Sequence, residues 1–347
     1  MRSHVTKIAR LVLQGLLILG ISFLLGEITV RTYHYFNPLF IFFDDSYNRF
    51  RGRPFSYDWD FKLNSQGFKD TEFGQKDDDA YRILGIGDSF AYGVVPYAYN
   101  YLTLLESQLR EEGLRAEVFN MGIPSIGPKD YFSLLIREGL QLRPDMVLLS
   151  FFIGNDILES HRDRKWYSYS YVASLIHYMV KIRPKYEGRI IHGKNVYCDT
   201  CPTFAPELYL QIESDRSRIY MTADADTPPF DEALDCLRQL RDVCRKNGID
   251  LVVVLIPDEV QINDVLQREV RNRLSVNQSR WNIQLPNNIL TAGLKEMGVD
   301  YVDLYPHFVK EAEENRLYKP RDTHWNIAGN QFAADIISNH LRGYVTK

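Results

Sequence analysis

The longest apolar stretch of the chain lies near its N-terminus. Residues 11–30 read LVLQGLLILGISFLLGEITV, and only Gln14 and Glu27 interrupt the apolar run. A helix of about 20 such residues spans a hydrocarbon layer of about 30 Å, whereas a buried core helix is rarely apolar on every side. The pattern therefore predicts a transmembrane helix over residues 11–30.

Basic residues precede this segment. Arg2, Lys7 and Arg10 lie within residues 1–10, and positive charge beside a membrane span favours the cytoplasmic side. The small-residue cleavage site of a removed signal peptide does not follow the apolar stretch. We therefore expect a single-pass anchor with a cytoplasmic N-terminus. The remainder of the chain would lie outside the cytoplasm, in the periplasm if the organism is a Gram-negative bacterium.

A second pattern begins at about residue 80, after a connector at 31–79 that has no sustained periodicity and is expected to pack on the domain that follows. Short apolar runs there alternate with amphipathic stretches of helical length. The predicted strands are 82–87, 116–121, 145–151, 250–256 and 299–304. The predicted helices are 102–112, 130–139, 231–247, 290–297 and 327–341. This alternation predicts an α/β domain over 80–347 with a mostly parallel sheet covered on both faces.

An irregular stretch interrupts the alternation between the third and fourth strands. Residues 159–229 are rich in Tyr and Arg and show no regular period. They form an insertion of one of two kinds: a lid or substrate-binding surface near the mouth of a site, or a plain structural elaboration. The pattern favours neither.

The composition excludes several classes of function. The chain has 347 residues, of which 45% are hydrophobic and 25% charged, as in ordinary globular proteins. Phosphate binding normally needs a basic face, and a net charge of -4 gives no electrostatic reason to expect a nucleic-acid partner. The eight histidines do not follow the spacing of zinc proteases. We expect no metal and no cofactor, and the sequence identifies no protein partner.

The four cysteines form two pairs of different kinds. Cys198 and Cys201 lie close together in YCDTCPTF, without the second C-x-x-C that a zinc site needs. We expect a local loop disulfide between them, which an oxidising compartment allows. Cys236 and Cys244 lie in a predicted helix, where free cysteines usually serve as small core residues.

Three predicted strands end in residues that can do chemistry. Open parallel sheets bind ligands beyond the carboxyl ends of their strands. The first strand runs into GIGDSF and places Ser89 at a turn, while the second ends in FNMGIP with Gly122 and the third in FFIGND with Asn155. A serine hydroxyl there could act as a nucleophile, and a glycine N–H or an asparagine amide could stabilise an oxyanion. Each of these residues is otherwise a common turn residue.

A possible base and acid lie near the C-terminus. The segment RDTHWNIAGN places Asp322 two residues before His324, ahead of the last predicted helix. An imidazole oriented by a carboxylate is the base of Ser-His-Asp catalysis. Asn326 fits the N-cap of that helix better than a catalytic role.

The four blocks GDSF, NMG, GND and DTHWN occur in the order and approximate spacing of the SGNH (GDSL) hydrolase family, which the chain resembles from residue 81 to 342. The resemblance implies a three-layer α/β/α sandwich with a five-stranded parallel sheet. It also implies Ser89 as nucleophile, His324 as base and Asp322 as acid. The backbone N–H groups of Ser89 and Gly122 and the side chain of Asn155 would form the oxyanion hole.

The last block departs from the usual D-x-x-H of this family. Arg321 stands three residues before His324, and the acid stands two before it. Asp303, at the end of the last predicted strand, is therefore an alternative acid.

The DTHW form is also similar to a block of alginate O-acetyltransferase-like proteins, in which the Asp-His block precedes the serine block instead of following it. Together these resemblances imply a serine esterase that acts through an acyl-enzyme on ester groups, O-acetyl groups of a cell-surface glycan above all. The alternatives are an O-acyltransferase to polysaccharide, an esterase of lipids, and an inactive binding protein of polysaccharide assembly.

Overall fold

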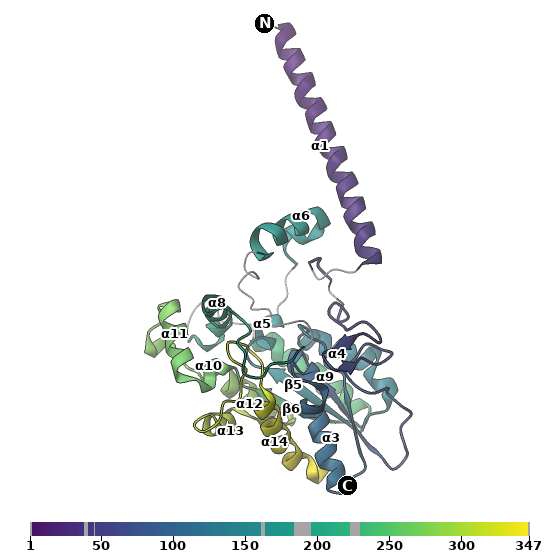
Figure 1. The fold of residues 1–347 in the computed structure, drawn as a ribbon, viewed down its shortest axis with the longest axis vertical. Helices are drawn as coiled ribbons and strands as arrows, with labels where there is room; N and C mark the ends of the chain where they lie inside the picture. The colour runs from purple at the N-terminus through teal and green to yellow at the C-terminus, as the bar shows by residue number, and fades with distance from the viewer. Residues whose placement is uncertain are drawn as a thin grey trace. The chain divides into compact units, whose positions relative to one another are not determined.

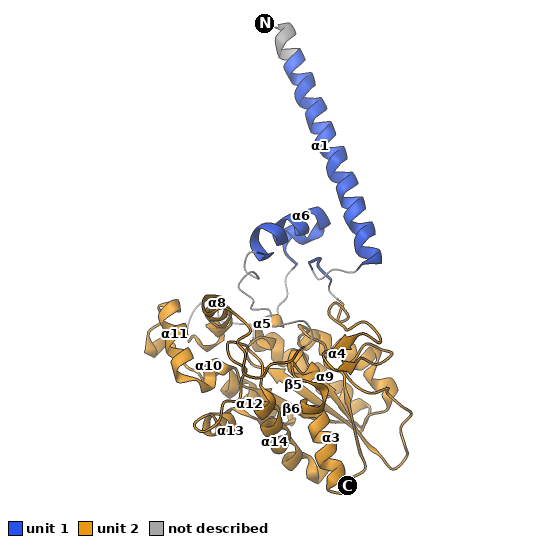
Figure 2. Ribbon diagram, viewed as in Figure 1, with its two compact units in different colours: residues 1–45, 163–187 blue, residues 46–162, 188–347 orange. Residues whose placement is uncertain are grey.

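The computed structural model describes residues 2–37, 41–44, 46–160, 164–183, 196–222 and 230–345. Parts of the predicted insertion, residues 161–163, 184–195 and 223–229, lie outside the described residues. The chain forms two compact units (Figure 2): residues 1–45 with 163–187, called unit 1 here, and residues 46–162 with 188–347, called unit 2.

Unit 1 contains the predicted membrane helix. Helix α1 (Arg2–Phe36) runs through the whole apolar stretch. Its segment Lys7–Phe36 is long and apolar enough to cross a membrane, a property that signal anchors share with signal sequences. The unit also holds the short helices η3 (Trp166–Tyr169) and α6 (Tyr171–His177), and α6 continues into the π-helical turn η4 (Tyr178–Ile182).

Unit 2 is built on a five-stranded parallel sheet, which confirms the predicted fold class (Figure 1). Its order is β4-β3-β5-β6-β7, and every neighbouring pair is parallel. The five strands match the five predicted runs: β3 (Tyr81–Ile86), β4 (Ala116–Asn120), β5 (Met146–Phe152), β6 (Asp250–Ile256) and β7 (Asp300–Asp303).

Helices cover both faces of this sheet because its strands are apolar on both faces. All seven residues of β5 are buried. Alternate residues of the strands belong to two separate hydrophobic clusters, one on each face. One cluster contains residues of α3 (Tyr101–Glu111) and α14 (Ile327–Val345). The other contains residues of α4 (Pro128–Arg137), α9 (Phe230–Lys246) and α12 (Leu285–Met297). The result is the three-layer α/β/α sandwich that the resemblance implied.

Further helices lie in the connections between these elements. They are α2 (Ser89–Tyr92), η1 (Tyr97–Tyr99), η2 (Gly139–Leu142), α5 (Asp156–Glu159), α8 (Pro206–Arg216), η5 (Ser217–Tyr220), α10 (Glu259–Ile262), α11 (Asp264–Leu274), η6 (Gln278–Arg280) and α13 (Tyr305–Glu311). Before the sheet, β1 (Tyr57–Asp58) and β2 (Phe61–Lys62) form a small antiparallel pair.

A truncation in the central strand should destabilise unit 2. Leu148 is fully buried on β5, between Gly85 of β3 and Val252 of β6. Leu148→Ala should lower the free energy of unfolding by about 2–5 kcal/mol, because a cavity is added to the lost burial. Chemical denaturation of the full chain in mild detergent, followed by tryptophan fluorescence, measures this difference.

The matched control for this truncation is Val265→Ala, at a side chain on α11 that is 56% exposed. It should change stability by no more than about 0.5 kcal/mol. Equal midpoints for the two variants would contradict a core centred on β5.

Candidate active site

Ser89 projects from a tight turn between β3 and α2. The strand ends at Ile86, and α2 begins at Ser89 itself. A Cβ atom at Gly87 would lie 2.8 Å from the Cβ of Ser150, so only glycine fits this turn. The carboxylate of Asp88 caps α2 by accepting the N–H of Phe90 at 2.9 Å. The turn therefore leaves the Ser89 side chain half-buried at the carboxyl end of the sheet.

A chain of hydrogen bonds joins Ser89, His324 and Asp322. The Nε2 atom of His324 lies 2.9 Å from Ser89 Oγ, and its Nδ1 atom lies 2.7 Å from Asp322 Oδ1. An ionised Asp322 requires the proton on Nδ1, which leaves Nε2 free to accept the hydroxyl proton. The three residues that the sequence singled out thus lie in the arrangement that a Ser-His-Asp mechanism requires.

The short D-x-H spacing has a local explanation. The Oδ1 atom of Asp322 accepts both the backbone N–H of His324 at 3.1 Å and its ring Nδ1. A turn of this kind needs the acid two residues before the histidine. The alternative acid, Asp303, has other partners in this structure: its Oδ1 atom accepts the amide of Asn287 at 2.9 Å and the N–H of Tyr305 at 3.1 Å, at the start of α13.

The Asp322 carboxylate is buried and has three polar partners. Burial by itself would raise its pKa, but the hydrogen bond and charge of His324, the nearby Lys319 and the Thr203 hydroxyl hold the pKa of Asp322 well below its usual range. Thr203 donates to Asp322 Oδ2, and Lys319 Nζ lies 3.4 Å from the same oxygen. The carboxylate therefore stays ionised and fixed opposite His324.

Part of the predicted insertion holds this acid in place. Cys198 and Cys201 form the expected disulfide. Within the loop that it closes, Asp199 accepts the N–H of Ile327 at the start of α14, at 2.9 Å. Just beyond the loop, the N–H groups of Thr203 and Phe204 donate to the carbonyls of residues 320 and 321. Residues 197–204 thus support the segment that carries Asp322 and His324, whereas Cys236 and Cys244 are buried and free, as predicted.

The two predicted oxyanion donors at the strand ends lie near the turn that carries Ser89, but each already contacts another group of the chain. The N–H of Gly122 donates to Asn120 Oδ1 at 2.8 Å. A Cβ atom at Gly122 would lie 2.1 Å from the backbone nitrogen of Tyr92, so this glycine lets β4 approach α2 closely. The Nδ2 atom of Asn155 lies 3.4 Å from Asp88 Oδ2, a long contact for an N–H donor.

Three charged residues that support these blocks were not predicted from the sequence. Asp88 is fully buried, which raises its pKa, and its Oδ2 atom lies 3.5 Å from Ser89 Oγ. Lys69 is buried and donates to the carbonyl of Gly93, just after α2, at 2.8 Å. Asp70 accepts the N–H of Asn120 at 2.7 Å, and burial raises its pKa to about 6. The only signal for Lys69 and Asp70 was their place in LNSQGFKD, ahead of the first strand.

One protein-family model matches part of the chain. Residues 215–346 match the model described as "SGNH hydrolase-like domain, acetyltransferase AlgX". This part of the chain is similar to an SGNH hydrolase-like domain of the AlgX type. The matched residues include Asp322 and His324, while Ser89, Gly122 and Asn155 precede them.

Solved structures similar to this chain are esterases and acylhydrolases of low sequence identity. An acetyl xylan esterase is 17% identical, with a TM-score of 0.45 over 75% of this chain and 99% of its own. A lipase/acylhydrolase from Enterococcus faecalis is 15% identical, with a TM-score of 0.43 over 76% and 96%. A two-domain esterase active on acetylated mannans is 17% identical, with a TM-score of 0.42 over 77% and 50%. No curated protein sequence matches the chain.

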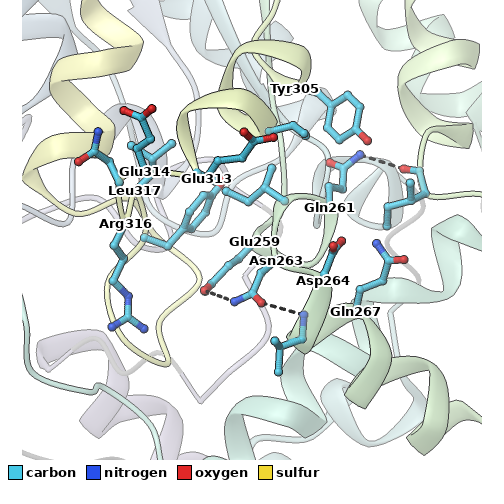
Figure 3. Close-up of a pocket in the computed structure, with 17 residues that line it drawn as sticks. Glu259, Gln261, Asn263, Asp264, Gln267, Tyr305, Glu313, Glu314, Arg316 and Leu317 are labelled. Carbon is cyan, nitrogen blue, oxygen red and sulfur yellow. Dashed lines mark hydrogen bonds between the residues drawn. The ribbon is translucent and has the colours of Figure 1, made fainter.

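A cavity of about 760 Å³ in the same unit does not contain the Ser-His-Asp group (Figure 3). It lies between α10, α11 and α13, and its lining includes the acidic residues Glu259, Asp264, Glu313 and Glu314. Burial raises the pKa of Glu259 to about 7, although the hydroxyl of Tyr209 and the amide of Asn263 favour its ionised form. None of the candidate site residues lines this cavity.

Removing the Thr203 hydroxyl should impair the site without unfolding it. Thr203→Val takes one donor from the buried Asp322 carboxylate, and a hydrogen bond to a charged group is worth about 1.5–3 kcal/mol. We expect kcat on an activated ester to fall on the order of tenfold or more, with KM nearly unchanged.

Thr203→Ser keeps the hydroxyl and is the matched control, expected to remain within about twofold of the parent on the same energy scale. An equal loss in both variants would indicate that the methyl group, not the hydrogen bond, supports the site.

Proposed function

We propose that this chain is a serine esterase of the SGNH type that acts through an acyl-enzyme on O-acetyl esters of a cell-surface glycan. The observation that carries the proposal is the hydrogen-bonded chain from Ser89 through His324 to Asp322, with distances of 2.9 and 2.7 Å. The AlgX-type match over residues 215–346 supports an ester substrate and, among acyl groups, favours acetyl.

In the first half of the proposed reaction, His324 Nε2 takes the hydroxyl proton as Ser89 Oγ attacks the ester carbonyl. The Asp322 carboxylate stabilises the imidazolium that forms. The tetrahedral intermediate then collapses, the bond to the sugar oxygen breaks, and His324 gives its proton to that oxygen. The free sugar hydroxyl leaves, and the acyl group remains on Ser89 as an ester.

In the second half, an acceptor hydroxyl takes the place of the departed alcohol. His324 removes its proton, the acceptor oxygen attacks the acyl carbonyl, and Ser89 recovers its proton from His324. Water as acceptor gives acetate. A sugar hydroxyl as acceptor gives a new ester, so transfer is the second candidate function. The match to a domain described as an acetyltransferase favours it.

The oxyanion is assigned first to Ser89 and Asn155. The N–H of Ser89 lies in the first turn of α2, where backbone donors have no partner within the helix. The Asn155 amide makes only a long contact to Asp88 at 3.4 Å and can turn toward a substrate. The Gly122 N–H is a third donor in this proposal, and it would have to share or exchange its bond to Asn120.

The proposed location follows from α1. We assign the helix as a signal anchor with a cytoplasmic N-terminus, so that unit 2 acts outside the cytoplasm. The basic residues before the apolar stretch and the Cys198–Cys201 disulfide support this location. A non-catalytic binding protein of polysaccharide assembly would not need the Ser89–His324 contact at 2.9 Å, which favours the enzyme.

The nucleophile is tested by Ser89→Ala in the full chain. Release of p-nitrophenol from p-nitrophenyl acetate should fall by at least about a thousandfold, since a lost nucleophile removes the acyl-enzyme route. Labelling by a fluorophosphonate should disappear as well. Ser107→Ala, at an exposed serine of α3, is the matched control and should keep both signals. Equal turnover and labelling in the parent and in Ser89→Ala, with both folded, would contradict the serine mechanism.

The oxyanion assignment is tested by Asn155→Ala. Loss of one donor should lower kcat by about 100- to 1,000-fold while KM changes little, because the amide acts on the transition state. The fluorophosphonate should still label Ser89, more slowly. An unchanged kcat would remove Asn155 from the oxyanion hole and leave Ser89 as nucleophile.

A further inference from the structure

A basic and aromatic segment of unit 1 has no part in the proposed chemistry. Residues 164–183 read RKWYSYSYVASLIHYMVKIR and contain four Lys or Arg residues, five aromatic residues and no Asp or Glu. The segment forms η3, α6 and η4 in succession. Such a composition is typical of helices that lie in the boundary layer of a membrane.

The segment exposes an apolar face. Ile176, Met179 and Val180 are 58%, 45% and 62% exposed. Their spacing of three and four residues puts them on one side of the helix. Trp166, at the start of the segment, is 82% exposed, and Tyr169 is 63% exposed. Apolar side chains grouped in this way gain free energy when another apolar phase covers them.

Glu27 fixes this segment to α1. Its carboxylate accepts the Ser170 hydroxyl at 2.8 Å and the N–H groups of Tyr171 and Val172 at 2.9 and 3.0 Å, which are the first donors of α6. Arg31, one turn further along α1, pairs with Glu27 and donates to the Tyr169 carbonyl at 3.2 Å. Glu27 is one of the two polar interruptions in the apolar stretch 11–30, and the structure explains it as the cap of α6.

Steric fit supports the same attachment. A Cβ atom at Gly26 would lie 3.4 Å from Val172 Cγ2, so the glycine lets α6 approach α1. The guanidinium of Arg31 lies 4.2 Å from the ring centroid of Tyr171, and Phe42 stacks on that ring at 4.3 Å. The attachment thus combines packing with hydrogen bonds.

The attachment also sets the depth of the segment in a membrane. Glu27 lies three residues before the end of the apolar stretch 11–30, which is about 4.5 Å along a helix. A segment held at that level lies where the hydrocarbon meets the headgroups. Tryptophan and tyrosine gather at this boundary, and Lys and Arg reach from it to phosphate groups.

We propose that residues 164–183 form an interfacial helix that docks on a bilayer containing anionic lipid. Ile176, Met179, Val180 and Trp166 insert at the edge of the hydrocarbon, and the basic side chains contact the headgroups. The proposal rests on α1 being a retained membrane anchor, and it is independent of the esterase chemistry. Cleavage after α1 would remove Glu27, which accepts the first N–H groups of α6, so the attachment favours an α1 that is retained.

A lipid surface explains the observations better than a protein partner does. The apolar face belongs to a segment fixed to a helix that itself crosses hydrocarbon, so the two apolar surfaces share one environment. Four basic residues without an acidic one fit the negative potential of anionic lipids.

The experiment places a fluorescent probe on the apolar face of the full chain. Ile176→Cys is labelled with a nitrobenzoxadiazole maleimide and reconstituted in vesicles of phosphatidylcholine and phosphatidylglycerol. The parent chain measures background labelling of its buried cysteines. Val265→Cys on α11, 56% exposed, is the matched control. Spin-labelled lipids should quench the probe at position 176, and aqueous iodide should quench it severalfold less than the probe at position 265.

Iodide quenching of position 176 equal to that of position 265 would overturn the proposal. Shielding from both iodide and spin-labelled lipid, found only in native membranes, would identify a protein partner and would also overturn it. A second variant guards against misfolding at position 176: brominated lipids should quench tryptophan emission of the parent chain more than that of Trp166→Phe.

Three further measurements test the docking proposal and separate it from the esterase proposal. Mass spectrometry of the purified chain establishes whether α1 is retained, and a chain cleaved after α1 would overturn the docking proposal while leaving the esterase proposal intact. Adding Ser89→Ala to the labelled Ile176→Cys chain should leave the quenching of the probe at position 176 unchanged. Glu27→Gln should loosen the attachment and increase iodide quenching at position 176, and unchanged quenching would contradict the proposed role of Glu27.

Discussion

The ionised carboxylate of Asp322 is the group on which the candidate site depends. It is buried, and a buried charge without partners would be very unfavourable. His324, Lys319 and Thr203 supply those partners and hold its pKa well below the usual range. Because one carboxylate oxygen accepts both the backbone and the ring of His324, the acid orients the imidazole and shapes the turn at once. With the imidazole held in this way, its Nε2 atom lies 2.9 Å from Ser89 Oγ.

The parallel sheet brings the other parts of the site to this carboxylate. Strands β3, β4 and β5 are neighbours, so the residues after them meet at one edge although Ser89 and Asn155 are far apart in the chain. Support comes from segments outside the sheet. Lys69 and Asp70 brace the turns after β3 and β4, and residues 197–204 brace the segment that carries the acid and the base. The irregular insertion is therefore, at least over these residues, a structural support of the site.

Glu27 is a second carboxylate that needs partners, in unit 1. A carboxylate at the end of an apolar helix is costly unless it has donors. It finds them at the first turn of α6, which has unsatisfied backbone N–H groups of its own. The carboxylate and these N–H groups thus satisfy each other's hydrogen bonds. The basic segment that contains α6 is thereby fixed at a defined level of α1.

Local patterns in the sequence were sufficient for the five strands of the sheet and for the helices that cover it, but not for α8, α11 and α13. The five strands are continuous apolar runs because each is covered on both faces, and a run of that kind is visible without any tertiary information. The C-x-x-C disulfide and the helix over 11–30 are equally local. The choice between Asp322 and Asp303 was not local, because only packing shows that Asp303 accepts the amide of Asn287 and the N–H of Tyr305 while Asp322 faces His324. The partners of Thr203, Lys69 and Glu27 likewise come from distant parts of the chain. Local periodicity reports which face of an element is buried, and only the folded chain decides which polar groups meet when that face is covered.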